Sequence, residues 1–328
     1  MELVRLGHNG PQVAAVGVGC WAWGDRLYWD YGQTYDKQDL REAFLASLSA
    51  GLTFFDTAEV YGLGNSERLL GAFIAESGAE VVVASKFFPL PWRLSRPQLL
   101  AALRRSLGRL GLAQIQLYQM HWPMPPISVE RWMDAMANAV EAGLIKQVGV
   151  SNYNPQQTEG AHKALQSRGL HLASNQVRYS LLDRALERSG LLKLCKDLGV
   201  TVIAYSPIAQ GLLTGKYGPQ NPPPRRRQVS RGTLERLQPL LNALRRIGAA
   251  HGSKTPAQVA INWCIAKGTL PIPGAKNGEQ ARENGGALGW SLGEKDMAGL
   301  EEISAGMESE PGGYGEPWRD ERRAVKAA

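Results

Sequence analysis

Four polar side chains of different types follow short apolar runs in the first part of the chain, and together they could transfer a proton. They are Asp56 in the run FFDTAEVYG, Tyr61 five residues later, Lys86 at the end of VVVASK and His121 in LYQMHWP. A tyrosine hydroxyl has a pKa of about 10, and a nearby ammonium makes it a better acid by stabilising its ionised form. Lys86 would supply that charge while paired with Asp56, and His121 would orient a carbonyl oxygen by hydrogen bonding. We refer to these four residues as the tetrad.

Each member of the tetrad has an ordinary structural role open to it when it is considered alone. Asp56 could cap a following helix, and Tyr61 could be a half-buried core aromatic. Lys86 could be a solvated strand end, and His121 a hydrogen-bonded core histidine. Their joint occurrence at the ends of consecutive predicted strands favours a catalytic set over these separate roles.

The elements that must position the tetrad alternate between two types along the chain. Short runs rich in apolar and β-branched residues predict strands at 14–19, 52–56, 80–85, 115–121, 145–150, 172–177, 200–205 and 270–272. Segments with helical spacing lie between them, at 40–48, 66–74, 95–110, 129–142, 156–167, 186–198, 233–250 and 280–286, with an extra helix near 295–304. Eight alternating pairs, preceded by a hairpin over 3–13, predict a closed (β/α)8 (TIM) barrel, in which the strand ends meet on one face.

Two of the predicted helices carry boundary signals. Gly51 is typical of a helix end, since glycine accepts the left-handed backbone that closes many helices. Ser95 and Gln98 stand at capping-box spacing around Pro97, ahead of leucines at 99, 103, 107 and 110.

An open, doubly wound sheet is the alternative architecture for such an alternation. A dinucleotide-binding sheet of that kind carries a G-x-G-x-x-G turn between its first strand and helix. Here Gly17 and Gly19 are followed by Cys20, Trp21 and Ala22, and a tryptophan-rich stretch follows rather than a helix. The sequence therefore disfavours a Rossmann domain.

Composition sets the broad class of the protein. The chain has 328 residues, of which 44% are hydrophobic and 20% charged, so it can bury a sizeable core. We expect one domain over 1–328, with a barrel core at about 3–305 and a tail at 306–328. No apolar run is long enough to span a bilayer, and the N-terminus lacks the pattern of a secretory signal. These features predict a protein of the cytoplasm, or of the plastid stroma if a transit peptide has been removed.

Cysteine, histidine and charge patterns exclude several other functions. Cys20, Cys195 and Cys264 are widely spaced, which indicates reduced thiols, and the scattered histidines predict no metal site. The net charge is +7, but the only dense basic cluster, 225–227 behind three prolines, is typical of a solvated loop. We therefore expect no nucleic-acid partner, and a monomer or weak homo-oligomer.

Several motifs, taken in order, resemble those of the aldo-keto reductase superfamily over roughly residues 3–305. They are DTAEVYG with GNSERLLG, ASK, HWP, GVSNY, NQVRYSLL, AYSPIAQGLLTGKYG and PIPGAKNGEQARENGGAL. The runs CWAWGD, PWRLS and AINWCIAKGT are most similar to the plant plastid and cyanobacterial branch that includes pyridoxal reductase-like enzymes. The resemblance implies NADPH-dependent reduction of an aldehyde or ketone, with pyridoxal as one candidate, and a catalytic tetrad in which Tyr61 is the general acid.

The resemblance also implies how this chain binds NADPH. Ser151, Asn152 and Gln176 match positions that hydrogen-bond the nicotinamide carboxamide, and Tyr205 matches the ring stacked on the nicotinamide. The segment 206–214 would wrap the pyrophosphate, although it could be an ordinary βα loop. The remaining implied cofactor contacts, including those at the adenosine end, are Trp21, Ser206, Pro207, Ile208, Gln210, Gly211, Leu213, Thr214, Gly274, Ala275, Lys276, Gln280, Glu283 and Asn284.

One departure from the family pattern bears on the choice of nucleotide. Many members carry an arginine for the adenine and the 2′-phosphate where this chain has Gln280. Lys276 remains the expected partner of the 2′-phosphate, and Arg282 would be turned to a different face of its helix. These observations favour NADPH over NADH.

The substrate and two rival functions stay open at this point. We expect an aromatic mouth lined by Trp21, Trp23, Tyr28, Trp29, Phe87, Phe88, Trp92 and Trp122, which would suit a flat or apolar carbonyl compound. One rival is an NADPH-binding regulatory or redox-sensing barrel with slow turnover. The other is a lyase or aldolase that uses the strand-end lysine to form a Schiff base.

Overall fold

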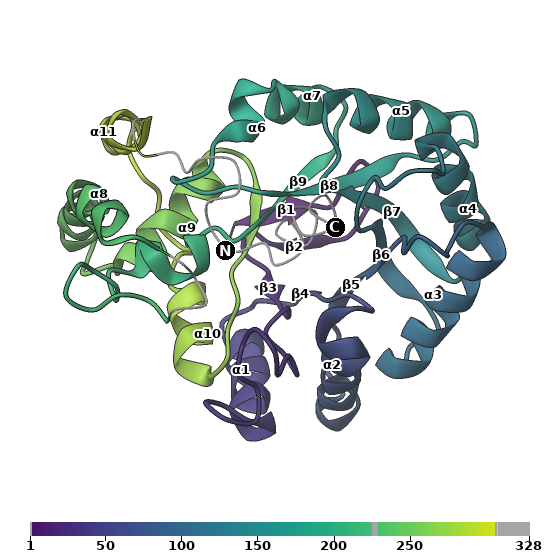
Figure 1. Ribbon diagram of the computed structural model, residues 1–328, viewed down its shortest axis with the longest axis horizontal. Helices are drawn as coiled ribbons and strands as arrows, with labels where there is room; N and C mark the ends of the chain where they lie inside the picture. Colours follow the sequence, from purple (N-terminus) through teal and green to yellow (C-terminus); the bar gives the residue numbers. More distant parts are fainter. Residues whose placement is uncertain (1, 225–228, 306, 308–328) are drawn as a thin grey trace, which may run out of the picture.

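A computed structural model of the chain describes residues 2–224, 229–305 and 307. Within them, eight parallel strands form one sheet in the order β10-β9-β8-β7-β6-β5-β4-β3. The strands are β3 Val18–Gly19, β4 Phe54–Asp56, β5 Val82–Phe87, β6 Ile115–Met120, β7 Ile145–Ser151, β8 Leu172–Arg178, β9 Thr201–Tyr205 and β10 Leu270–Ile272. A parallel bridge between Gly19 and Gly274 joins the two edge strands. The sheet thus forms a nearly closed barrel ringed by helices (Figure 1), and the predicted (β/α)8 fold is confirmed.

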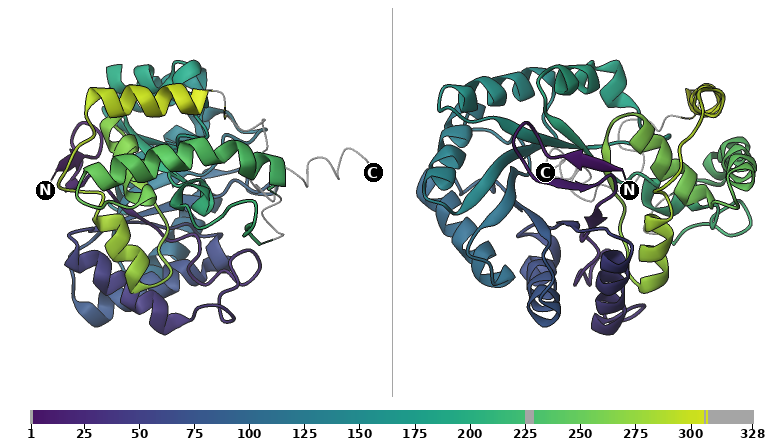
Figure 2. Two further views of the ribbon diagram at one scale, coloured as in Figure 1. Left: turned by 90° about the vertical axis from the view of Figure 1, so that its left-hand side faces the viewer. Right: turned by 180° about the vertical axis from the view of Figure 1, so that it is seen from behind.

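The predicted hairpin closes the far end of this barrel. Strands β1 Leu3–Arg5 and β2 Gln12–Ala14 pair antiparallel, and the hairpin lies across one open end in the view from behind (Figure 2, right). Leu6 and Val13 are buried among the residues that fill the barrel interior. The hairpin therefore supplies the apolar floor on which the inner layers rest.

Helices follow the strands and form the outer ring. They are α1 Lys37–Ser49, α2 Asn65–Ser77, α3 Arg96–Leu110, α4 Val129–Glu141, α5 Pro155–Gln166, α6 Ala185–Arg188, α7 Leu191–Asp197, α8 Arg231–Ala250, α9 Pro256–Ala266 and α10 Gly278–Gly285. The predicted extra helix is α11 Glu294–Ala305, which packs beside α8 (Figure 1). None of the helices in the described part combines the length and apolar character that crossing a membrane takes.

Of the two predicted boundary signals, the glycine stop of the first helix is confirmed, whereas the capping box of the third helix is only partly formed. Gly51 follows α1 with φ +76°, as expected of a helix stop. The leucines of α3 at 99, 103, 107 and 110 are buried. The predicted capping box is incomplete, because the Ser95 hydroxyl donates to Gln98 Oε1 (2.9 Å) rather than accepting from the backbone.

The sequence prediction was wrong at two helices and one strand. The segment 186–198 is broken into α6 and α7, since Gly190 adopts φ +75° between them. Helix α9 was missed because it is buried on nearly all sides, so it lacks the alternation of apolar and polar faces that reveals a helix. The first barrel strand, predicted at 14–19, is reduced to Val18–Gly19, and Ala14 belongs to the hairpin. The basic cluster at 225–227 lies outside the described residues, as does nearly all of the predicted tail.

The inner face of the barrel changes character along its axis. Phe54, Ala84 and Leu117 belong to an apolar layer that also contains Ile203 and Ile272. Successive inward positions on a strand are two residues apart. The next inward layer is therefore polar, and its members include Asp56, Lys86, Gln119 and Tyr205. This layer is the floor of the candidate site.

Candidate active site

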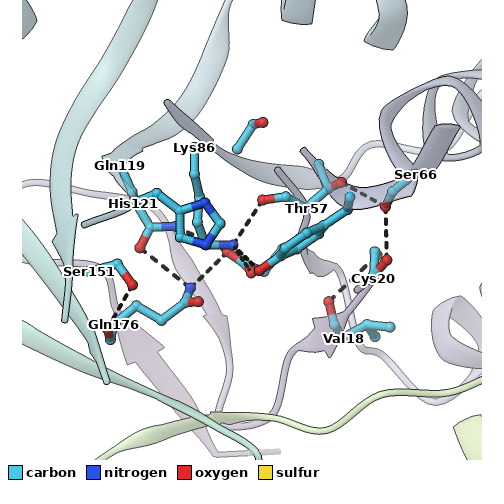
Figure 3. Close-up of polar contacts among 12 residues, drawn as sticks. Val18, Cys20, Thr57, Ser66, Lys86, Gln119, His121, Ser151 and Gln176 are labelled. Atoms are coloured by element: carbon cyan, nitrogen blue, oxygen red, sulfur yellow. Dashed lines mark hydrogen bonds and ion pairs between the residues drawn. The ribbon is translucent and has the colours of Figure 1, made fainter. Parts of the chain in front are cut away.

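A buried ion pair forms the centre of this floor. Lys86 is fully buried and Asp56 is 2% exposed. Lys86 Nζ lies 2.5 Å from Asp56 Oδ1, 2.9 Å from the Thr57 carbonyl oxygen and 3.3 Å from the Tyr61 hydroxyl (Figure 3). These contacts match the three N–H donors of an ammonium group. The ammonium is thus directed at both its counter-ion and the phenol.

The second oxygen of Asp56 accepts from side-chain amides. Gln176 Nε2 lies 2.8 Å and Gln119 Nε2 lies 3.0 Å from Asp56 Oδ2. Both glutamines are buried, and their amide groups face each other in the polar layer (Figure 3). The nitrogen of Gln176 is committed to Asp56, so its amide oxygen is the atom left to accept a hydrogen bond from a ligand.

The pKa of Tyr61 moves in the direction opposite to the sequence expectation. Burial, and then the charge of Asp56, hold the pKa of Tyr61 well above its ordinary value of 10. The expectation that Lys86 lowers this pKa is wrong for the protein alone, because Asp56 neutralises the ammonium at 2.5 Å and the surroundings are poor in water. The Tyr61 hydroxyl therefore keeps its proton at neutral pH.

His121 borders Tyr61 at the end of β6. Its ring stands edge to face with those of Tyr61 and Phe88, with centroids 5.7 and 5.3 Å apart. Burial, and then the charge of Lys86, hold the pKa of His121 well below 6.5. In the described part of the chain, its Nδ1 atom has no hydrogen-bond partner. His121 is thus a neutral imidazole, able to donate one hydrogen bond without carrying charge.

This neutral histidine predicts a loss of stability in acid. The unfolded chain takes up a proton at this histidine below pH 6.5, whereas the native state does not, so the free energy of unfolding falls as pH falls. The contribution is about 1 kcal/mol between pH 6.5 and 5.5. Urea unfolding of the wild type and of His121→Asn at pH 7.5, 6.5 and 5.5 measures it. The variant should lose about 1 kcal/mol less than the wild type on acidification, and equal losses in the two proteins would contradict a neutral His121.

A cavity of about 580 Å³ opens above the tetrad. Its lining brings together most of the residues singled out from the sequence, namely Trp21, Asp56, Tyr61, His121, Ser151, Asn152, Gln176, Tyr205, Ser206, Pro207, Ile208, Gln210, Gly211, Thr214, Gly274, Lys276, Gln280, Glu283 and Asn284. Lys86 lies below it. Leu213 and Ala275 are fully buried outside the lining, because their side chains pack into the core between sheet and helices.

The loop after β9 has an unusual backbone where it borders this cavity. Ser206, Ala209 and Gln210 have φ of +54°, +47° and +53°, and Gly211 has φ +95°. Such a run costs of order 1–3 kcal/mol at each non-glycine residue and is found mostly where a ligand is clamped. The last three of these residues belong to the short helix η2 Ala209–Thr214. Successive left-handed and right-handed residues turn backbone N–H groups toward one point, which suits an anion.

Comparison with known proteins identifies the family to which this chain belongs. The model of the Aldo/keto reductase family matches residues 15–305. The chain belongs to this family. It is 44% identical to the chloroplastic pyridoxal reductase of Arabidopsis thaliana over 307 residues, which cover 89% of this chain and 84% of the relative.

Solved structures give the same result. An aldo-keto reductase from Klebsiella pneumoniae in complex with NADPH has a TM-score of 0.74 and 29% identity, covering 94% of this chain and 96% of that one. A thermostable aldo-keto reductase in complex with the inhibitor epalrestat has a TM-score of 0.75 and 31% identity, covering 92% and 100%. The chain is therefore an oxidoreductase of this family.

The aldo/keto reductase holds the residues around Ser151 in a continuous network. Asn152, with φ +62°, donates from Nδ2 to Ser151 Oγ (3.0 Å) and accepts at Oδ1 from the Tyr205 hydroxyl (3.0 Å). Ser151 Oγ in turn donates to the Gln176 carbonyl oxygen (2.9 Å). The network fixes the orientation of these side chains before any ligand arrives, which lowers the entropy lost on binding.

The aromatic mouth of the reductase is smaller than the sequence suggests. Trp21, Trp29 and Trp122 line the cavity. Trp23 and Phe87 are fully buried, and Trp23 donates to the Ala275 carbonyl oxygen (2.9 Å), so the expectation that they line the mouth is wrong.

Three further aromatics of the predicted mouth lie outside the lining. Trp92 is 68% exposed, and Phe88 packs on His121. Tyr28 stacks on Trp21, with centroids 5.1 Å apart, and its hydroxyl donates to Oε1 of Gln210 (2.9 Å), which is a lining residue.

Several residues of this reductase site were missed from the sequence. Arg178, Lys216 and Tyr217 line the cavity, and Gln119 lies under it. Arg178 follows Gln176 by two residues on β8, and Gln119 on β6 precedes His121, which comes directly after that strand, by two residues. The two-residue period of a strand places such pairs on one face, so this spacing was the available signal.

Proposed function

We propose that this reductase uses NADPH to reduce an aldehyde or ketone to the alcohol, with Tyr61 as the general acid. The observation that carries the proposal is the Tyr61 hydroxyl, which stands at the cavity floor 3.3 Å from the buried Lys86 ammonium. As negative charge develops on the carbonyl oxygen, Tyr61 delivers its proton to that oxygen. The neighbouring Lys86 ammonium stabilises the phenolate that remains, and the imidazole of His121 orients the oxygen by a hydrogen bond.

The residues around the cavity fit a nicotinamide dinucleotide. Bound there, NADPH supplies the hydride. Gln176 Oε1 and the Ser151–Asn152 pair would hold the carboxamide, and Tyr205 would face the ring. The left-handed backbone at 206–211 would hold the pyrophosphate, and the stretch 274–284 the adenosine end. Gln280 has a role of its own here, because its Oε1 accepts from the Lys276 backbone N–H (2.9 Å) and fixes that turn.

Lys276 supports the choice of NADPH over NADH. Its ammonium lies 4.8 Å from the ring centroids of both Trp29 and Tyr35, which hold the charge at the edge of the cavity. Arg282 lies outside the cavity lining, as its helical position predicts. Lys276 is therefore the expected cation for the 2′-phosphate.

Lys276→Ala should raise the Kd for NADPH by about ten- to a hundredfold, since a charge-assisted hydrogen bond is lost. The Kd for NADH should change little, because NADH has no 2′-phosphate. Quenching of protein fluorescence by each nucleotide measures both constants. The matched control is Lys254→Ala, which removes a lysine held over the Trp290 ring outside the cavity lining. Equal weakening of NADPH and NADH would contradict the assignment of Lys276.

The substrate we propose is a flat carbonyl compound, with pyridoxal as the first to test. Two observations support it: the aromatic lining of Trp21, Trp29 and Trp122, and the pyridoxal reductase among the relatives. That relative also supports the plastid stroma, beside the cytoplasm, as the compartment. A panel of aldehydes and ketones that includes pyridoxal, run with NADPH and with NADH, tests the proposal. No turnover of any carbonyl would favour a regulatory or redox-sensing barrel instead.

The structure argues against the Schiff-base alternative. Lys86 is fully buried and its ammonium is bonded to Asp56, the Thr57 carbonyl oxygen and Tyr61, so it has no clear approach to a substrate carbonyl. A nucleophilic lysine must be neutral and exposed to the carbonyl carbon. Borohydride should therefore trap no substrate on the protein in the absence of NADPH.

A further inference from the structure

Gln119 is a buried amide in the barrel interior that the proposed reaction does not use directly. It is fully buried on the inner face of β6, between Leu117 in the apolar layer and His121 at the cavity. The interior of such barrels is filled mainly by branched apolar side chains. A buried primary amide is costly unless it is hydrogen-bonded, so its presence here calls for a partner that needs it.

That partner is the carboxylate of the ion pair. Gln119 Nε2 donates to Asp56 Oδ2 (3.0 Å), and Gln119 Oε1 accepts from Gln176 Nε2 (3.4 Å), which also donates to Asp56 (2.8 Å). Lys86 contacts the other oxygen, Oδ1. A carboxylate that is almost completely removed from water requires donors at both oxygens to remain ionised. Gln119 supplies one of those donors while leaving the cavity lining untouched.

The neighbouring strand is shaped to admit this side chain. Gly149 on β7 pairs with Gln119 in register. A Cβ atom at residue 149 would lie 2.9 Å from Gln119 Cγ and 2.4 Å from Ser174 Oγ. A larger residue at 149 would therefore force the side chain of Ser174 or of Gln119 to shift. The absence of a side chain at Gly149 thus leaves room for the side chain of Gln119.

We propose that Gln119 is a positioning residue for the reduction. It fixes the Asp56 carboxylate in the orientation that keeps the Lys86 ammonium against the Tyr61 hydroxyl. This inference rests on the proposed function of the tetrad. The alternative is that Gln119 only fills space, in which case an apolar residue of similar size would serve equally well.

Two substitutions at this position separate the roles. Gln119→Leu keeps the volume and removes the donor, so kcat should fall by about ten- to a hundredfold, the worth of one hydrogen bond to a charged group. KM and the Kd for NADPH should stay within about threefold.

Gln119→Glu should make kcat depend on pH through the introduced carboxyl. In acid the introduced carboxyl is protonated and can still donate to Asp56 Oδ2, so kcat should recover there. As pH rises, the second carboxylate ionises beside Asp56 and the two repel each other, so kcat should fall. A kcat that falls with rising pH in Gln119→Glu but not in Gln119→Leu is not expected from a change in packing alone.

The matched control is Gln116→Leu, the same change on the same strand, where the period of two places the side chain on the opposite face. It should keep the kcat and pH profile of the wild type, and thermal unfolding of all variants reports whether they fold. A wild-type kcat in Gln119→Leu would overturn the inference. If Gln119→Leu does not fold, a wild-type pH profile in Gln119→Glu would overturn it. Tyr61→Phe is run in parallel, because full activity in that variant would refute the tetrad itself.

Discussion

Tyr61→Phe should reduce kcat for aldehyde reduction by about 10² to 10⁴, the usual contribution of a general acid. The substitution removes the hydroxyl 3.3 Å from Lys86 Nζ and keeps the ring that borders His121. The carbonyl oxygen then gains negative charge with no proton donor beside it. The Kd for NADPH should stay within about threefold, because the lost interaction is made mainly in the transition state. Stopped-flow absorbance and nucleotide titration measure the two quantities.

The control for this variant is Tyr118→Phe, which removes a hydroxyl from a fully buried tyrosine of β6 next to the polar layer. Its kcat should remain close to that of the wild type. If Tyr61→Phe instead retains more than about a tenth of the wild-type rate on every substrate, another group donates the proton. The barrel assignment would be unaffected by that result.

Much of the barrel could be predicted because its elements carry strong periodic signals. The leucines of α3 recur at helical spacing along its buried face. Strands β5 and β7 contain β-branched residues in short, mostly buried runs. Helix α9 has no such contrast, since its residues from Val259 to Ile265 are all buried. Gly190 divides α6 from α7 through a backbone conformation that composition alone does not determine. Tertiary burial and local φ therefore decided the elements that were missed.

The site was predictable to the extent that strand ends could be located. Asp56, Lys86 and His121 each follow an apolar run, and the barrel brings such ends together. The direction of the Tyr61 pKa was not predictable, because it depends first on how completely the hydroxyl is buried and then on the charge of Asp56. Gln119 was missed because a single glutamine in a strand resembles any solvated position until its inward direction is known.

The buried ion pair makes the second large prediction, which concerns stability. Asp56→Asn leaves the Lys86 ammonium fully buried without its counter-ion, and removal of one partner from such a pair costs about 3–5 kcal/mol. The free energy of unfolding, measured by urea at pH 7 with an unchanged m-value, should fall by that amount. The control is Asp39→Asn, a half-buried aspartate without a buried counter-ion in the first turn of α1, which should cost far less.

The pH dependence of Asp56→Asn follows from the same burial. Burial lowers the pKa of Lys86, and Asp56 opposes that shift in the wild type. Without Asp56, Lys86 becomes neutral in the native state at a pH where the unfolded chain still holds the proton, with a pKa of 10.5. The unfolded state then binds more protons, so the stability of the variant should rise as pH increases toward 10.

A double variant separates the cost to stability from the cost to catalysis. Asp56→Asn with Lys86→Met removes both charges and fills the lysine site with an apolar chain of similar length, while Gln119 and Gln176 can still donate to the asparagine oxygen. Replacement of a whole buried pair by neutral groups is often neutral or stabilising, so most of the lost free energy of unfolding should return. Carbonyl reduction should not return, because no ammonium faces Tyr61. If the double variant is as unstable as Asp56→Asn alone, packing rather than the unpaired charge determines the loss. If it regains activity, Lys86 has no part in proton donation by Tyr61.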